Sequence, residues 1–431
     1  MPNVRSTHTD SCGFFGSTTP QALARQYGTP LYVYNEGILR ARCRELKGLS
    51  TVSGFQVNYS AKANANLHLL EIVRSEGLVV DAMSPGEIHL NTIAGFTPDQ
   101  ILYVCNNAGS EELANAVRHG LLVSVDCLSQ LETLGKVYQR EGVAGGRAML
   151  RLNPGVGAGH HQKVITAGKE TKFGISPADI PQAFALLDAH NMRLVGINQH
   201  IGSLFMEPRG YVQAAEFLLE FVRSLPVERR SMLDVLDFGG GFGIPYHKYQ
   251  GEARLDLAML GGQLEALMRR FMADTGYAGR FLVEPGRYVM AECGLLLGQV
   301  HAVKTNGDTR YVGTDLGFNQ LMRPVLYDSF HDMEIYREGG QPVPESAYTA
   351  QTIVGNICES GDILAKNRLL PPLCEGDVLG VLDAGAYGYV MSSTYNQRLR
   401  PAEVLIDTQG QPRLIRRRES LEDLMSGYAD L

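Results

Sequence analysis

The sequence predicts an α/β fold in which a (β/α)8 TIM barrel is followed by an all-β domain. Short apolar runs alternate with amphipathic stretches over residues 36–295, which is typical of parallel strands joined by helices. The runs lack polar alternation, as expected for strands that are buried on both faces. Beyond residue 295 this alternation ends, and short β-branched segments bounded by turns follow. The chain has 431 residues, more than one ordinary core accommodates.

The eight predicted barrel strands are apolar runs that each precede a helix-like stretch. They cover residues 55–60, 78–83, 101–105, 121–126, 148–152, 194–198, 235–238 and 281–283. Residues 66–77, 110–120 and 210–225 have helical periodicity, and two of these stretches end in Gly, as helix C-termini often do. Eight such units match the size of a (β/α)8 barrel. A doubly wound open sheet is the alternative, and the lack of a GxGxxG motif in the first unit disfavours it.

The C-terminal β domain, a barrel or a sandwich, is predicted from five strand-like segments. These cover residues 295–305, 309–317, 348–356, 377–385 and 400–417. Residues 29–35 are also strand-like, and we expect them to join this domain, with Asn35 capping the first barrel helix. The predicted division is therefore residues 36–295 for the barrel and residues 1–35 and 296–431 for the β domain. The sequence leaves open whether residues 1–20 are ordered.

Composition excludes several classes of partner. The net charge is -7, from 39 basic and 46 acidic residues, and the only basic block is residues 416–418, so a nucleic-acid partner is not expected. No run of 18 apolar residues predicts a membrane span, and the N-terminus lacks the layout of a signal peptide. The seven cysteines are scattered and form no CxxC pair. They indicate a reducing cytoplasm and argue against a disulfide framework or a metal site.

Polar residues and glycines collect at the carboxyl ends of the predicted strands, where this barrel fold carries its chemistry. Each of them has a simple structural alternative: a surface lysine, a member of a buried ion pair, or a core histidine. It is their joint placement that favours a functional site. They are Lys62 after the first strand, Asp81 in the second, Arg151 in the fifth, His200 to Ser203 after the sixth, residues 239–243 after the seventh and residues 284–287 after the eighth.

The loops after the seventh and eighth strands predict a phosphate site, and the lysine after the first strand predicts an imine. The GGGFG run at 239–243 could offer backbone amides to an anion. No Lys-Ser/Thr pair follows it, so it is not a nucleotide P-loop, but the loops after strands 7 and 8 are the usual phosphate site of this fold. A desolvated Lys62 could form an imine with an aldehyde, and Glu284 could face a pyridine nitrogen. Together these features suggest pyridoxal 5'-phosphate, with His200 stacked on its ring.

The motifs resemble those of the fold-type III pyridoxal-phosphate decarboxylases, which share an alanine racemase-like barrel, and above all the diaminopimelate decarboxylases. The resemblance runs from YGTPLYVYNE at 27–36 to RPAEVLI at 400–406. SAKAN, DAMSPGE, HIGS, GGGFG and EPGR follow one another in the family's order. The β domain adds DLGFNQLMRPVLYDSFH at 315–331, CESGD at 358–362 and DAGAYGYVMSSTYNQRLRPAEV at 383–404. The ornithine and arginine relatives carry a different form of CESGD.

The resemblance implies a role for each matching residue. Lys62 would hold the cofactor and Cys358 would protonate the intermediate. The residues implied around the cofactor are Asp81, Arg151, His200, Ser203, Gly240, Gly241, Glu284, Gly286, Arg287 and Tyr387. The residues implied for the substrate are Arg287, Arg323 and Tyr327 at its distal carboxylate, Glu359 at its distal amine, and Tyr387. In the family Cys358 and Glu359 reach the site of the neighbouring subunit, which implies a homodimer.

The implied reaction is decarboxylation of meso-diaminopimelate to L-lysine and CO2, the last step of lysine biosynthesis, by a carboxy-lyase. Two departures from the family pattern bear on substrate preference: Leu204, where many members have Gln, and residues 104–112. One alternative is a related decarboxylase acting on ornithine, lysine, arginine, carboxynorspermidine, or a siderophore or antibiotic intermediate. A further alternative is a pyridoxal-phosphate protein without catalytic activity, which the presence of Lys62 and Cys358 disfavours.

Overall fold

The computed structural model describes residues 7–153 and 172–429 and divides into two units. The barrel unit comprises Arg40–Ile244 and Arg254–Val289, and the β unit comprises Met1–Leu39, Pro245–Ala253 and Met290–Leu431. This division differs from the predicted one because residues 36–39, 245–253 and 290–295 group with the β unit. Side-chain bonds explain residues 245–253: Lys248 Nζ lies 2.8 Å from both carboxylate oxygens of Asp383, and the Tyr249 hydroxyl donates to Glu334.

Eight parallel strands close the barrel, as predicted from the eight apolar runs. They are β2 (Phe55–Tyr59), β3 (Val79–Ala82), β4 (Ile101–Val104), β5 (Leu122–Val125), β6 (Arg147–Leu152), β7 (Arg193–Gln199), β8 (Val235–Gly240) and β9 (Arg280–Glu284). The first strand pairs with the last, with Phe55 opposite Phe281 and Val57 opposite Val283. A cluster of five buried side chains fills part of the interior: Leu102, Val104, Met149, Val235 and Leu282.

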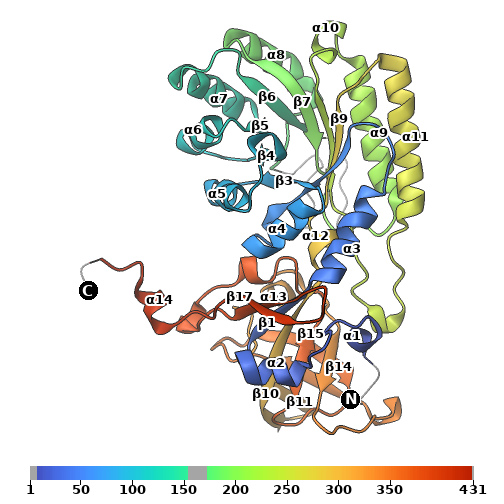
Figure 1. Cartoon of the computed structure of the whole chain (residues 1–431), viewed down its shortest axis with the longest axis vertical. Coiled ribbons are helices and arrows are strands. Elements are labelled where there is room, and N and C mark those ends of the chain that lie inside the picture. Colours follow the sequence, from blue (N-terminus) through green and yellow to red (C-terminus); the bar gives the residue numbers. More distant parts are fainter. Residues whose placement is uncertain (1–6, 154–171, 430–431) are drawn as a thin grey trace. The chain divides into compact units, whose positions relative to one another are not determined.

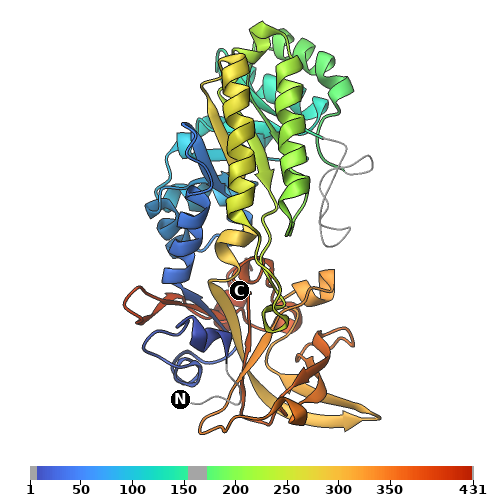
Figure 2. The same cartoon turned by 90° about the vertical axis from the view of Figure 1, so that its right-hand side faces the viewer.

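Helices follow the strands and surround the barrel, as Figure 1 shows. They are α3 (Glu36–Lys47), α4 (Leu67–Ser75), α5 (Pro85–Ile93), α6 (Ser110–Arg118), α7 (Leu128–Arg140), α8 (Ile180–Ala189), α9 (Pro208–Ser224), α10 (Val227–Arg230), α11 (Leu257–Thr275) and α12 (Arg287–Met290). The longest two, α9 and α11, run side by side (Figure 2). Local chemistry sets the helix starts: the Asn66 side chain accepts from His68 N–H at α4, and the Ser84 hydroxyl accepts from Glu87 N–H at α5.

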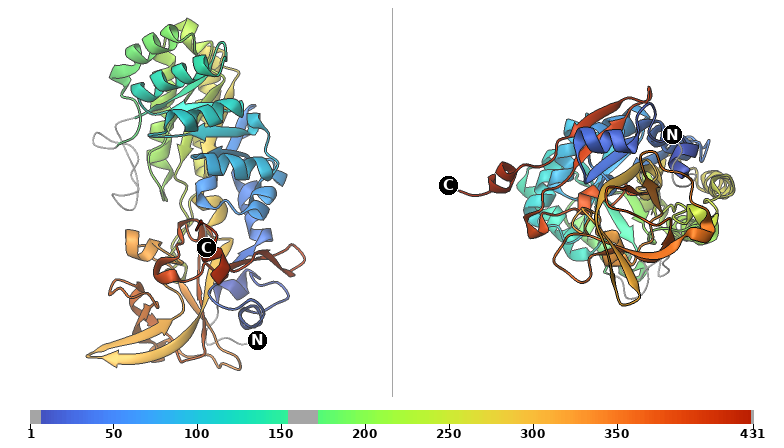
Figure 3. Two further views of the ribbon diagram at one scale, coloured as in Figure 1. Left: turned by 90° about the vertical axis from the view of Figure 1, so that its left-hand side faces the viewer. Right: turned by 90° about the horizontal axis from the view of Figure 1, so that it is seen from below.

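The β unit is a mostly antiparallel sheet of nine strands. They are β1 (Leu31–Asn35), β10 (Gly294–Asn306), β11 (Thr309–Thr314), β12 (Met333–Tyr336), β13 (Thr349–Val354), β14 (Ile363–Leu370), β15 (Val378–Val381), β16 (Ala402–Ile406) and β17 (Pro412–Arg416). Strand β1 lies between β10 and β16, which confirms that the N-terminal strand joins this sheet. Strands β10 and β11 form a long antiparallel ribbon (Figure 3).

Two strands of this sheet, β12 and β14, were not predicted. Strand β14 carries Lys366, Asn367 and Arg368, so its sequence lacks the apolar pattern of a strand. It pairs only with β13, and the edge of a sheet tolerates charged side chains. Strand β12 has only four residues, all buried, which is too short for a period to be recognised.

Short helices complete the β unit: α1 (His8–Ser11), α2 (Pro20–Tyr27), α13 (Arg323–Tyr327) and α14 (Leu421–Met425). Phe14 and Phe15 are buried in its core with Leu31, Val33 and Leu297. Part of the N-terminal segment is therefore ordered by packing against the sheet, which the sequence had left open. Across residues 7–153 and 172–429, no helix combines the length and the apolar character that crossing a membrane requires. All seven cysteines lie within these ranges, and none forms a disulfide.

The predicted cap at Asn35 is confirmed, and it can be tested by mutation. Asn35 Oδ1 accepts from Ile38 N–H at 2.9 Å, and Nδ2 donates to the Phe14 carbonyl at 2.8 Å. We expect Asn35→Ala to lower the free energy of unfolding by about 1–2 kcal/mol, measured by denaturant titration. Asn35→Asp keeps the cap acceptor and is the control. If it loses as much stability as the alanine variant, the cap is not the source of the effect.

Candidate active site

Lys62 lies in a short 3-10 turn, Ala61–Ala63, that follows β2, and neighbouring strand ends fix this turn. Asp81 at the end of β3 accepts from the Ser60 hydroxyl at 2.8 Å and from Ala61 N–H at 3.0 Å. Ser60 N–H also donates to the Pro285 carbonyl after β9, at 3.2 Å. The backbone around Lys62 is therefore held from both neighbouring strands, while its side chain is only half-buried.

Buried acids surround this lysine. Burial raises the pKa of Asp81 to about 7, and the positive charge of Lys62 opposes that rise. The positive charge of Lys62 also opposes the rise that burial causes in the pKa of Glu87 and helps to lower the pKa of Glu284. The ammonium therefore lies near the ends of β2, β3 and β9. The amine and the acid predicted to face the cofactor therefore lie in one neighbourhood.

The pKa values of Glu284 and Asp237 shift in opposite directions although both side chains are buried. Burial raises the pKa of Asp237 well above its ordinary value, and the charge of Glu284 adds to this rise. Burial would also raise the pKa of Glu284, but the positive charge of Lys62 opposes this effect, and the pKa lies below its ordinary value. The pKa of Asp237 is therefore the higher of the two, and that of Glu284 is the lower.

His200, at the end of β7, is a neutral side chain. Burial lowers its pKa to about 4. Its Nδ1 accepts from Gly240 N–H at 3.1 Å and lies 3.6 Å from Glu284 Oε2. The ring is thus fixed between the glycine turn after β8 and the carboxylate of β9.

The glycines after β8 allow a close backbone approach that side chains would prevent. A Cβ on Gly240 would collide with the Glu284 carbonyl, and one on Gly241, which has a φ of +107°, would collide with the Gly202 carbonyl. Arg287 Nη2 donates to the Ser203 hydroxyl at 3.0 Å. The structure thus brings the predicted phosphate residues of β7, β8 and β9 together, with Gly286 in the turn between β9 and Arg287.

Arg151 ends β6 and is almost fully buried. Its guanidinium lies 4.6 Å from the centre of the Phe173 ring. Burial lowers its pKa, and the charges of Glu284 and Asp126 oppose that change. The predicted motif around Arg151 continues to Pro154, which lies outside the described residues.

These barrel residues fit pyridoxal phosphate. The Oε1 atom of Glu284 is buried and has no hydrogen-bond partner among the described residues, so a donor such as a protonated ring nitrogen would satisfy it. The glycine turn at 240–241 lies beside Ser203 and Arg287, whose hydroxyl and guanidinium could bind a phosphate, and Lys62 offers an amine for the aldehyde. Within the described part of the chain, no group of three or more His, Cys, Asp or Glu side chains is arranged to hold a metal ion.

Neighbouring side chains of the β unit fix the position of the Arg323 side chain. It is buried at the start of α13, its Nη1 lies 2.8 Å from His331 Nε2, and its guanidinium lies 4.9 Å from the centre of the Tyr246 ring. Because His331 Nδ1 lies 2.7 Å from the Leu382 carbonyl, that nitrogen donates and Nε2 accepts from Arg323. Tyr327 ends the same helix and is half-buried.

Cys358 and Glu359 are exposed on a loop of the β unit whose backbone is fixed. Asp362, from the same CESGD motif, accepts from the N–H groups of Ile357 and Phe318, both at 2.8 Å. Asn396 Nδ2 donates to Cys358 Sγ at 3.1 Å, and the Tyr395 hydroxyl donates to Glu359.

Two bulky side chains near these motifs have left-handed backbone conformations. Tyr387, in the GAYG turn, has a φ of +56° and Leu204, after HIGS, has a φ of +69°. Such values are uncommon for residues of this size and concentrate at functional sites. Tyr387 is predicted to bind the cofactor, and Leu204 departs from the family pattern. At both positions the fold imposes the backbone conformation.

Sequence reasoning missed Asp237, His331, Tyr395 and Asn396. Asp237 is an acid within an apolar strand, which is itself a signal of an unusual environment. The other three lie inside the long β-domain motifs but were given no role of their own. Their contacts to Arg323, Glu359 and Cys358 could only be seen in the structure.

The protonation of His200 predicts a pH response. In an unfolded chain a histidine binds a proton near pH 6.5, whereas the folded site excludes it until about pH 4. Between these values the unfolded state binds more protons, so acidification weakens the folded state at this position. NMR titration of the His200 Cε1–H signal should show no midpoint above about pH 5, with exposed His119 as the reference. A midpoint near pH 6 would contradict a neutral ring.

Comparisons with known proteins identify the family of this chain. Residues 37–291 match the family model described as "Pyridoxal-dependent decarboxylase, pyridoxal binding domain". The chain is 38% identical to a diaminopimelate decarboxylase of Methanothermobacter thermautotrophicus, over 96% of this chain and 94% of the relative. It is 35% identical to one of Escherichia coli K12, over 94% of each.

Solved structures give the same result. The crystal structure of diaminopimelate decarboxylase from Helicobacter pylori complexed with L-lysine has a TM-score of 0.85 and 28% identity, covering 94% of this chain and 98% of that one. A second diaminopimelate decarboxylase structure has a TM-score of 0.86 and 33% identity, covering 96% and 98%. The barrel, the lysine turn and these likenesses together show that this chain belongs to the pyridoxal-phosphate-dependent decarboxylases of the diaminopimelate decarboxylase family.

Proposed function

We propose that this protein decarboxylates meso-diaminopimelate to L-lysine and CO2. The observation that carries the proposal is the convergence of Lys62, Glu284 and the glycine turn at 240–241 in the barrel unit, together with the fixed CESGD loop. The full-length relatives named diaminopimelate decarboxylase support this substrate.

Each barrel residue has a defined task in the proposed reaction. Lys62 would hold pyridoxal phosphate through its aldehyde. When bound, the cofactor supplies the electron sink for the pair released as CO2 leaves. Glu284, the member of the Asp237–Glu284 pair with the lowered pKa, would stabilise a protonated ring nitrogen. His200 is a neutral ring, so it adds no positive charge that would compete with the ring nitrogen for Glu284. Arg287 and Ser203, with backbone N–H groups of Gly241 and Gly286, would bind the phosphate beside Gly240, whose own N–H donates to His200.

The β-unit residues select the substrate and complete the reaction. Arg323 is held by His331 and Tyr246 with few conformations to lose, so it can bind a distal carboxylate at low entropic cost. Tyr327 and Arg287 add contacts to that carboxylate, and Tyr387 contacts cofactor or substrate. Glu359 binds the distal ammonium, and Cys358 Sγ delivers the proton to the α-carbon after CO2 has left.

The proposed enzyme is a homodimer with shared active sites. The support is that Cys358 and Glu359 are exposed in the chain yet held by a rigid loop, as expected for groups that act in a partner's site. We also assign the enzyme to the cytoplasm, because seven cysteines without a disulfide are typical of a reducing compartment.

A CO2-release assay with a panel of amino acids tests the substrate. The holoenzyme should release CO2 from meso-diaminopimelate much faster than from ornithine, lysine or arginine. Lys62→Ala is the control, since it should abolish both turnover and the visible absorption of the bound cofactor. Brisk turnover of ornithine or arginine without turnover of diaminopimelate would refute the assignment.

Subunit complementation tests the shared site. Lys62→Ala and Cys358→Ala each inactivate both sites of a homodimer, but a mixed dimer regains one intact site. An equimolar mixture, dissociated and reassembled, should recover about a quarter of wild-type activity, because half of the dimers are mixed and each has one working site. No recovery in mixed dimers isolated with two affinity tags would mean that each chain supplies its own Cys358.

A further inference from the structure

A cavity of about 380 Å³ lies at the amino-terminal end of the barrel. Six of the residues that line it are the first residues of six strands: Val79, Ile101, Leu122, Arg147, Val235 and Arg280. Lys62 and its neighbours follow the opposite ends of the strands, so this cavity is separate from the candidate active site. Its volume is within the range of small-molecule sites.

Asn58, on β2, is the first indication of a ligand. Its side chain lines the cavity and is fully buried. Neither its Nδ2 nor its Oδ1 has a hydrogen-bond partner among residues 7–153 and 172–429. A buried amide without partners weakens the fold, and an aliphatic side chain of similar size would not. A ligand in the cavity would give this amide its missing partner.

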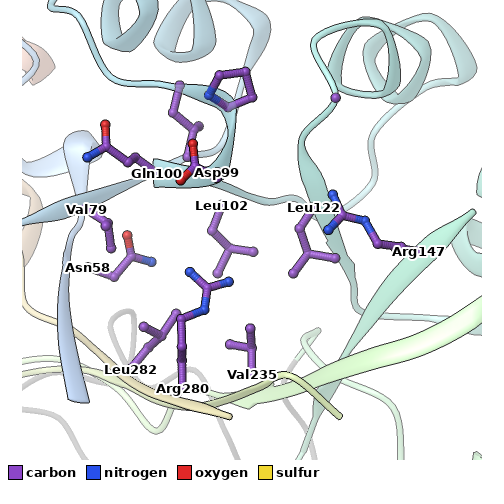
Figure 4. Close-up of a pocket in the computed structure, with 13 residues that line it drawn as sticks. Asn58, Val79, Asp99, Gln100, Leu102, Leu122, Arg147, Val235, Arg280 and Leu282 are labelled. Atoms are coloured by element: carbon purple, nitrogen blue, oxygen red, sulfur yellow. The ribbon is translucent and has the colours of Figure 1, made fainter. Parts of the chain in front are cut away.

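Two arginines make the cavity favourable for an anion. In Figure 4 the Arg280 guanidinium stands in the middle of the lining residues, with Asn58 on one side and Leu122 and Arg147 on the other. The Arg280 side chain makes a long contact, 3.4 Å from Nη1 to Gln56 Oε1. The Thr97 hydroxyl lowers the pKa of Asp99, and the charge of Arg280 adds to this effect. Asp99 is the lining residue of opposite charge, and it is exposed and accepts from the Thr97 hydroxyl. Two guanidiniums and one carboxylate give the lining a net charge of +1.

The remaining wall of the cavity is apolar, which favours a ligand with a hydrocarbon group. Leu102, Val235 and Leu282 belong to the buried cluster of the barrel interior and form part of the lining, and Leu122 packs against them. A bare inorganic anion would make no favourable contact with these side chains. A ligand with an anionic head and an apolar body would contact both parts of the wall.

We propose that this cavity binds a small carboxylate with an apolar body. Arg280 and Arg147 bind the carboxylate, the Asn58 amide donates a hydrogen bond to it, and the leucines and Val235 cover the hydrocarbon part. This site is independent of the proposed decarboxylation, because none of its lining residues belongs to the candidate active site.

Calorimetric titration of the holoenzyme with hexanoate tests this proposal. Hexanoate should bind, and the neutral 1-hexanol and the cationic hexylamine should bind at least about tenfold more weakly. Arg280→Gln should weaken hexanoate binding by about tenfold or more, and Asp99→Asn should strengthen it because a like charge is removed. Arg193→Gln is the matched control: Arg193 is exposed at the start of β7, at the same end of the barrel, but does not line the cavity.

The proposal is overturned if hexanoate does not bind, or if Arg280→Gln binds it as well as the wild type does. An equal loss with Arg193→Gln would also overturn it, because it would show a general effect of surface charge.

Asn58→Leu gives a second readout that does not depend on activity. It should raise the melting temperature of the protein without hexanoate, because it removes an unpaired buried amide. It should also reduce the further rise that hexanoate causes in the wild type, because one hydrogen bond to the carboxylate is lost. A leucine variant that keeps the full hexanoate-induced rise would remove Asn58 from the site.

Discussion

The pairing of the first barrel strand with the last is the constraint on which the candidate site depends. Lys62 follows β2 and Glu284 ends β9, and these positions are more than 200 residues apart in the chain. Closure of the parallel barrel makes β2 and β9 neighbours, and Ser60 N–H then binds the Pro285 carbonyl. Asp81 fixes the other side of the same turn. An open sheet of the same strands would leave the amine and the acid at opposite edges.

The unequal pKa values of the buried acids follow from this closure. Asp81, Asp237 and Glu284 compete for few positive charges in a region from which water is excluded. Full ionisation of all three would be unfavourable, so the pKa values of Asp81 and Asp237 rise while that of Glu284 falls. The chemistry needs one defined carboxylate, and crowding of like charges provides it.

Rigid support organises the exposed candidate residues of the β unit. Arg323 is buried, but Cys358 and Glu359 are exposed and depend on Asp362, Asn396 and Tyr395 for their positions. The left-handed backbone of Tyr387 shows that the fold also imposes a conformation that this side chain does not favour. A second copy of the chain could use such preformed exposed groups without further ordering.

The sequence by itself determined the barrel, its eight strands, the Asn35 cap and the strand-end residues, because strong periodicity and short-range capping are local properties. It also supplied the cofactor, since the lysine, the glycine run and the acid each have a recognisable chemistry. Only the tertiary structure identified the charged edge strand β14, the roles of Asp237 and His331, and the cavity around Asn58. Edge exposure, pKa values and cavities depend on which residues meet across the closed barrel or the sheet, and a local pattern does not contain that information.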